Sequence, residues 1–133
     1  MEYGSEVQRL FAAPLHCGEL PPNVPGLASG EAEDRTQPVW VRFQLEVAEG
    51  VVRRARYRVF GCPHTIAAAE RAAEWLEGRP ATALAALDLR EIGRALGVPA
   101  EKLGKLLRIE DALAACRRSL ETRTELNDGD TTD

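Results

Sequence analysis

The sequence predicts an α+β fold, because one part of the chain has the two-residue period of paired strands and other parts have the period of helices. Between residues 39 and 60, apolar and polar side chains alternate on both sides of a short turn. After residue 62, apolar side chains recur at helical spacing. At 133 residues the chain has the length of one domain with a single hydrophobic core.

The two predicted strands, 39–47 and 51–60, form an antiparallel hairpin around a turn at residues 48–50. The second strand alternates apolar residues with three arginines: Arg54, Arg56 and Arg58. In an acidic protein we assign these arginines to a solvated face of the sheet that pairs with acids such as Glu46, and not to a phosphate-binding surface.

Before the hairpin, the sequence predicts a short amphipathic helix over residues 5–11, opened by a capping-box pattern of Ser5 and Gln8. Residues 13–38 carry several prolines and glycines and the charged run 31–35. They are expected to form a long loop with room for one edge strand.

Three more helices are predicted after residue 62. The first ends at Gly78 and turns four charged side chains largely towards solvent: Glu70, Arg71, Glu74 and Glu77. The second runs from Asp88, a good N-cap, to Leu96, and the last carries Cys116 on its apolar stripe, which assigns Cys116 to the core. We expect one folded domain over residues 1–121 and a disordered acidic tail over 122–133.

The charge balance argues against nucleic acid as a partner. Lys and Arg number 17 against 21 Asp and Glu, so the chain has a net charge of -4 and no basic surface for phosphate is expected. The sequence shows neither a signal-peptide pattern nor an apolar stretch long enough to span a membrane. A cytoplasmic location without membrane contact is therefore expected.

Soft metal ligands are few in this chain. The sequence has three cysteines and two histidines: Cys17, Cys62, Cys116, His16 and His64. The cysteines are too widely separated for a disulfide framework or a CxxC motif, so free thiols are expected. Each histidine lies beside or near a cysteine, and the Cys62-Pro63-His64 pair carries more weight because it falls where a strand gives way to a helix.

Cys62 is the first candidate for chemistry. A sulfur at the beginning of a helix lies beside backbone N–H groups and the positive end of the helix dipole, which favour thiolate over thiol. Thiolate is the form that binds iron or zinc and accepts sulfur from a persulfide. From the pattern alone, a small buried apolar residue at a strand end is an equally good interpretation.

The segment FGCPHTIAAAERAAEWLEGR, residues 60–79, resembles the part of the IscU/NifU iron-sulfur scaffold proteins that reads Phe-Gly-Cys-Gly-Ser-Ala-Ile-Ala, then small residues, then Thr-Glu-Trp and Gly-Lys. Two more segments resemble that family in the same order, RLFAAPLHCGEL at 9–20 and LDLREIGRALGVPAEKLGKLLRIEDALAA at 87–115. This resemblance implies a small antiparallel sheet with helices packed on one face. It also implies a non-enzymatic scaffold in iron-sulfur cluster assembly that works with a cysteine desulfurase and other assembly proteins.

Of the ligands that the resemblance implies, three cysteines assisted by an aspartate, only Cys62 carries over. The segment 35–39 has neither the family's cysteine nor its aspartate, and Gly104-Lys105 stands where the family has His-Cys. The resemblance therefore implies no catalytic residue, a metal or persulfide site at Cys62, and Lys105 as an auxiliary candidate. His64 is a second auxiliary candidate because it follows Cys62 by two residues. The cofactors that fit are an iron-sulfur cluster, a single iron or zinc ion, or none.

Several alternatives stay open at this point. His64 is more simply a polar residue in a first helical turn, although a homodimer joined face to face would offer two Cys and two His. Lys105 either projects towards Cys62 and favours its thiolate or turns outward to solvent. The function is iron or sulfur binding through Cys62 at a degenerate site, or that of a non-catalytic module that docks on a cysteine desulfurase or scaffold and regulates cluster assembly.

Overall fold

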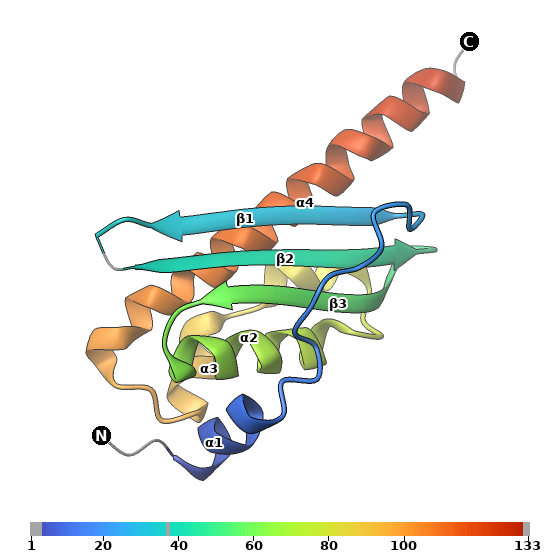
Figure 1. Cartoon of the computed structure of the whole chain (residues 1–133). Helices are drawn as coiled ribbons and strands as arrows, with labels where there is room; N and C mark the ends of the chain where they lie inside the picture. Colours follow the sequence, from blue (N-terminus) through green and yellow to red (C-terminus); the bar gives the residue numbers. More distant parts are fainter. Residues whose placement is uncertain (1–3, 37, 132–133) are drawn as a thin grey trace.

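The computed structural model describes the backbone of residues 4–36 and 38–131 and the side chains of 4–36 and 38–121. Its sheet has the order β1-β2-β3, formed by β1 (Leu27–Asp34), β2 (Val39–Ala48) and β3 (Val51–Phe60), all antiparallel (Figure 1). The helices are α1 (Ser5–Ala12), α2 (Pro63–Leu76), α3 (Leu89–Ala95) and α4 (Leu103–Thr131), with 3-10 turns η1 (Ala81–Ala86) and η2 (Ala100–Lys102). The predicted α+β class is confirmed.

The β2–β3 hairpin is built as its alternation predicts. Glu49 and Gly50 both have positive φ, at 54° and 75°, which gives the two-residue turn whose twist suits paired strands. The inward side chains of β2, such as Phe43 and Leu45, are fully buried. On the opposite face Arg54 lies 2.6 Å from Glu46, so the predicted pairing of the arginines with acids is confirmed at this position.

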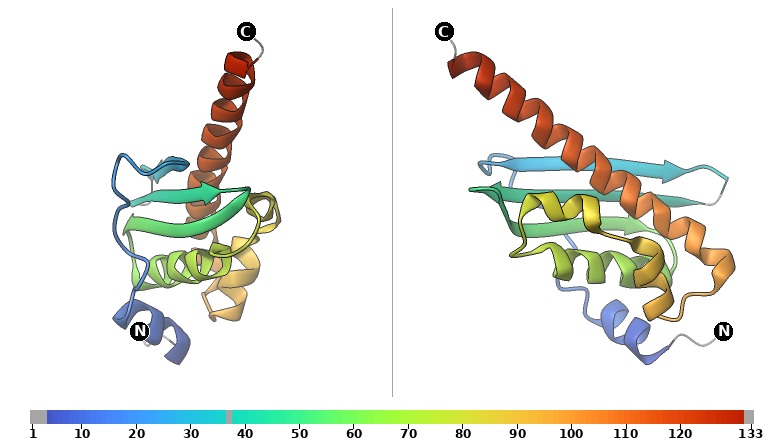
Figure 2. Two further views of the ribbon diagram at one scale, coloured as in Figure 1. Left: turned by 90° about the vertical axis from the view of Figure 1, so that its right-hand side faces the viewer. Right: turned by 180° about the vertical axis from the view of Figure 1, so that it is seen from behind.

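The helices cover one face of the sheet, as Figure 2 shows from two further sides: α4 crosses β1 and β2, and α2 lies along β3. The segment 13–26 passes over the other face on its way from α1 to β1 (Figure 1). It is held there by the backbone N–H of Leu20, which donates to Gln44 Oε1 at 2.8 Å, and the Leu20 side chain is buried. No described helix is both long and apolar enough to cross a membrane.

The largest difference from the expectation is β1, an eight-residue strand in a region expected to be mostly loop. Its inward positions include Ala28 and Gly30, which give no hydrophobic alternation to read. The small residues are required because α4 lies directly on this strand: a Cβ added at Gly30 would be 2.2 Å from the Ala112 carbonyl oxygen and 2.6 Å from the Cys116 nitrogen. Close packing of a helix on the sheet thus replaces large apolar side chains here.

Two local expectations were wrong. The N-cap of α1 is Gly4, and Ser5 already belongs to the helix, so Ser5 and Gln8 do not form a capping box. On α2, Glu70 is fully buried where the helical period placed it towards solvent. By contrast, Asp88 caps α3 as predicted, since its carboxylate accepts the backbone N–H groups of Arg90 and Glu91.

The contact at Gly30 makes a direct prediction about stability. Gly30→Ala should lower the free energy of unfolding by about 1–3 kcal/mol, because the added methyl group overpacks the interface between β1 and α4. Gly104→Ala is the matched control, since Gly104 lies in α4 and, apart from the adjoining backbone of that helix, no described atom lies within 4 Å of an added Cβ. Chemical denaturation of the two variants measures the difference. Equal stability would contradict the close packing.

The backbone of α4 continues as helix to Thr131, past residue 121 where the folded domain was expected to end. In Figure 1 the last turns of α4 extend beyond the sheet, so none of the three described strands lies beneath them. We predict that deleting the residues after Arg123 changes the free energy of unfolding by less than about 0.5 kcal/mol. A large fall in the melting temperature of the truncated chain would show that this end takes part in the fold.

Candidate functional site

Cys62 occupies the junction that the sequence indicated. β3 ends at Phe60, Gly61 follows, and Cys62 is the N-cap of α2 with extended backbone angles, φ -82° and ψ 167°. Pro63 begins the helix, where its missing N–H costs nothing because the first N–H groups of a helix have no intrahelical acceptor. The Cys62 side chain is half-buried, so solvent and partners reach it.

The surroundings of the sulfur favour the thiolate. Burial raises the pKa of Cys62, but hydrogen bonds from the Thr65 hydroxyl, the backbone N–H groups of Thr65 and His64, and the positive charge of Lys105 together lower it below the usual value. The Thr65 hydroxyl lies 3.6 Å from the sulfur. A thiol with a lowered pKa is a better nucleophile and metal ligand at neutral pH.

The two auxiliary candidates come from different elements. Lys105 belongs to the first turn of α4 and acts electrostatically on both Cys62 and His64. His64 lies in the first turn of α2, and it is only 3% exposed there. Burial, Lys102 and Lys105 lower the pKa of His64, which keeps its imidazole neutral.

The other two cysteines do not join Cys62. Cys116 is fully buried, its Sγ lies 3.3 Å from the Phe43 carbonyl oxygen, and burial raises its pKa to about 12. Its assignment to the core is confirmed. Cys17 is exposed on the segment 13–26, where it pairs with Tyr57 at the edge of β3.

The residues around Cys62 do not fit an iron-sulfur cluster held by one chain. Clusters ordinarily take four cysteine ligands, with histidine as an occasional substitute. Among the described side chains, a single group of three potential metal ligands (His, Cys, Asp or Glu) is close enough together to hold one ion. Cys62 is not part of that group. Any cluster at Cys62 therefore needs ligands from a second molecule.

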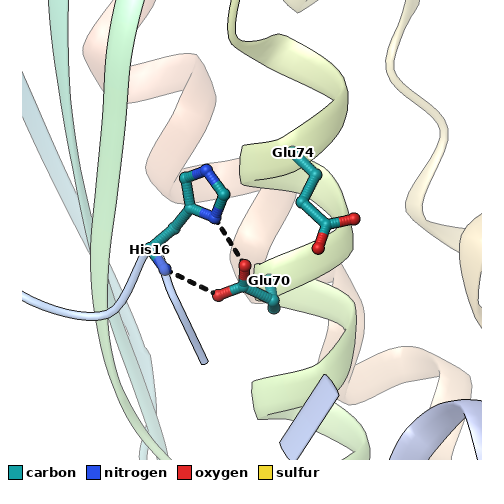
Figure 3. A group of neighbouring side chains, drawn as sticks. All are labelled: His16, Glu70 and Glu74. Carbon is teal, nitrogen blue, oxygen red and sulfur yellow. Dashed lines mark hydrogen bonds and ion pairs between the residues drawn. The ribbon is translucent and has the colours of Figure 1, made fainter. Parts of the chain in front are cut away.

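The group of potential metal ligands consists of His16, Glu70 and Glu74, and we call it the His16 cluster (Figure 3). His16 lies on the segment 13–26, and the two glutamates lie one turn apart on α2. His16 Nδ1 is 2.5 Å from Glu70 Oε2, and the backbone N–H of His16 donates to Glu70 Oε1 at 2.9 Å. The cluster ties the N-terminal segment to α2.

Two further side chains complete this network. The Tyr57 hydroxyl donates to Glu70 Oε1 at 2.9 Å, and His16 Nε2 lies 2.9 Å from Glu77 Oε1. Burial lowers the pKa of His16, but its hydrogen bonds to Glu70 and Glu77 and their negative charges outweigh burial and raise it. Because both ring nitrogens face carboxylate oxygens, the imidazolium is the form that satisfies both.

Sequence reasoning missed this network for a physical reason. Helical periodicity describes one helix in isolation and places Glu70 on its polar side, whereas the partner that buries Glu70 is 54 residues away in the chain. The only signal was the pairing of a histidine in a proline-rich segment with an excess of acids on a later helix. That signal does not specify which residues meet.

The fold and the site together define a class. A small antiparallel sheet, helices on one face and a cysteine at the start of the helix after the last strand are the features that the resemblance to iron-sulfur scaffolds implied. The family model of the NifU-like N-terminal domain matches residues 2–125. The chain belongs to this family.

Individual relatives agree with this assignment. The iron-sulfur cluster assembly scaffold protein IscU of Azotobacter vinelandii is 27% identical over 119 residues, covering 89% of this chain and 93% of its own. The iron-sulfur cluster assembly protein 1 of Arabidopsis thaliana is 29% identical, covering 94% and 77%. Among solved structures, the N-terminal part of a NifU-like protein from Brucella abortus superposes with a TM-score of 0.73 at 18% identity, covering 90% and 94%, and shows the same fold.

The contribution of Lys105 to the Cys62 site is testable by the pH dependence of thiol alkylation. In a chain with Cys17→Ser and Cys116→Ala, alkylation of Cys62 should reach half its maximal rate below the pH of about 8.5 that is usual for a thiol. Adding Lys105→Met should move that midpoint upward, because a nearby positive charge that favours thiolate is lost. A midpoint that stays in place would show that Lys105 does not act on Cys62.

Proposed function

We propose that this chain acts in iron-sulfur cluster assembly as a scaffold-like protein that binds sulfur or iron through Cys62 at a degenerate site. The observation that carries this proposal is the Cys62 thiol at the start of α2, with a lowered pKa, on a scaffold fold. The names of its relatives, which are cluster assembly scaffolds, support the same process.

The chemistry that suits a single activated thiolate is the acceptance of sulfur. The Cys62 thiolate would form a bond to the terminal sulfur of a donor cysteine persulfide, the donor's S–S bond would break, and the donor cysteine would leave as a thiolate. The products are a Cys62 persulfide and a free donor thiolate, so no oxidant or reductant is needed. Lys105 would stabilise the negative charge on Cys62 before and after the transfer.

A cysteine desulfurase is the donor that this proposal requires, and the surface beside Cys62 suits a protein partner. Phe60, two residues before Cys62, is 69% exposed, and it pairs across the strands with Trp40. Exposed aromatic side chains next to a reactive group are typical of contact surfaces. Remaining cluster ligands would come from that partner or from a second scaffold.

We predict that Cys62 alone accepts sulfur. The full chain incubated with a cysteine desulfurase and free cysteine should gain the mass of one sulfur atom, and so should the Cys17→Ser and Cys116→Ala variants. The Cys62→Ser variant should gain none. Intact-mass spectrometry without reductant measures this, together with iron, zinc and acid-labile sulfide analysis of the anaerobically purified chain.

The alternative function, a non-catalytic module that docks on a desulfurase or scaffold, gives a different result. A chain that binds the desulfurase equally well as wild type and as Cys62→Ala, and acquires neither sulfur nor iron, would refute the proposal in favour of this module. Sulfur found on Cys17 in the Cys62→Ser variant would refute the assignment of Cys62.

A further inference from the structure

Glu70 is a carboxylate in need of a positive partner. It is fully buried, and among the described residues its ion pair is with His16 alone. A buried carboxylate without a cation is costly, and a neutral imidazole does not compensate it. Two more carboxylates, those of Glu74 and Glu77, lie beside the same imidazole. Glu74 and Glu77 also have arginine partners, since Arg71 Nε lies 4.0 Å from Glu74 Oε2 and Arg56 Nη1 lies 3.0 Å from Glu77 Oε2. Glu70 therefore depends on the imidazole for its charge compensation more than the other two carboxylates do.

The donor atoms of the His16 cluster converge. One ligand atom from each of His16, Glu70 and Glu74 lies within 4.8 Å of the others. Figure 3 shows the three side chains gathered between the segment 13–26 and α2, with the Glu74 carboxylate beside that of Glu70. About a third of the Glu74 side chain is exposed, at 34%, which leaves a path from solvent for an ion.

The first two ligands are oriented from behind, as metal ligands in proteins usually are. His16 Nε2 is hydrogen-bonded to Glu77 Oε1, while Glu77 Oε2 accepts from the Ala55 backbone and from Arg56, so the imidazole presents Nδ1. On Glu70, the Tyr57 hydroxyl and the His16 backbone N–H both occupy Oε1. Oε2 faces His16 Nδ1 and is left for the shared proton or for an ion that replaces it.

We infer that His16 Nδ1, Glu70 Oε2 and the Glu74 carboxylate form a binding site for a divalent first-row transition cation. One imidazole nitrogen with carboxylate oxygens suits Mn²⁺, Fe²⁺ or Zn²⁺ and does not suit a soft ion such as Cu⁺. The ion takes the place of the proton between His16 and Glu70, and water completes its coordination. This site is independent of the proposed function of Cys62. Cys62, the N-cap of α2, precedes Glu70 by eight residues, which corresponds to a rise of about 12 Å along the helix.

The test measures Mn²⁺ binding to the full chain carrying Cys62→Ser, so that the thiolate cannot contribute. Electron paramagnetic resonance of free Mn²⁺ gives the affinity and stoichiometry, and Co²⁺ absorption reports the ligand field. We expect one bound ion per chain and a loss of affinity on the order of tenfold to hundredfold in Glu74→Gln. The Glu74→Gln variant distinguishes a metal site from a purely structural ion pair of His16 and Glu70, because Glu74 has no role in that ion pair.

Glu91→Gln is the matched control, since Glu91 is an exposed carboxylate on α3 outside the cluster. Its affinity for Mn²⁺ should equal that of the parent. His16→Gln should also abolish binding, with thermal melting used to show that the variant is folded. Equal Mn²⁺ affinity in Glu74→Gln and the parent, or no stoichiometric binding by the parent, would overturn the inference.

Discussion

The close approach of α4 to the sheet is the constraint on which the rest of the structure depends. Gly30 has no side chain, so the backbone of α4 near Ala112 and Cys116 rests directly on β1. This contact fixes the path of α4 across one face of the sheet and buries Cys116 against Phe43. The same helix begins at Leu103, and Lys105 in its first turn lies within electrostatic reach of Cys62. One helix therefore both packs against small residues of the sheet and contributes a positive charge near the candidate site.

The parts of the fold that local pattern determines could be predicted from the sequence. The β2–β3 hairpin follows from alternation and from a turn that both Glu49 and Gly50 make with positive φ, and α3 follows from Asp88 and its helical period. β1 could not be predicted because its inward residues are small, and their smallness has meaning only once α4 lies on them. Tertiary packing overrides local preference at that strand.

The same division holds for the candidate site. Cys62 is visible in the sequence because a strand-to-helix junction is a local feature, and resemblance to a family suggested the position of Lys105. The burial of Glu70 is not visible, because it depends on His16 and Tyr57, which reach α2 from other elements. The burial of His64 in the first turn of α2 is likewise not visible from the sequence. Glu70 is thus held by contacts between segments that are distant in the sequence.

Lys105 stands where the family has a cysteine ligand, so the Cys62 site of this chain has a different charge when no metal is bound. A set of several thiolates repels itself until a cation binds, so such a site is stabilised by its cargo. At Cys62 the positive charge of Lys105 instead helps to lower the thiol pKa with no ion bound, and the side chain is half-buried. Holding a cluster requires many ligands, whereas passing on one sulfur requires a single nucleophile and a surface for its donor. Our proposal of sulfur acceptance by Cys62 rests on this electrostatic setting, while Glu70 and Glu74 of the His16 cluster lie further along the same helix.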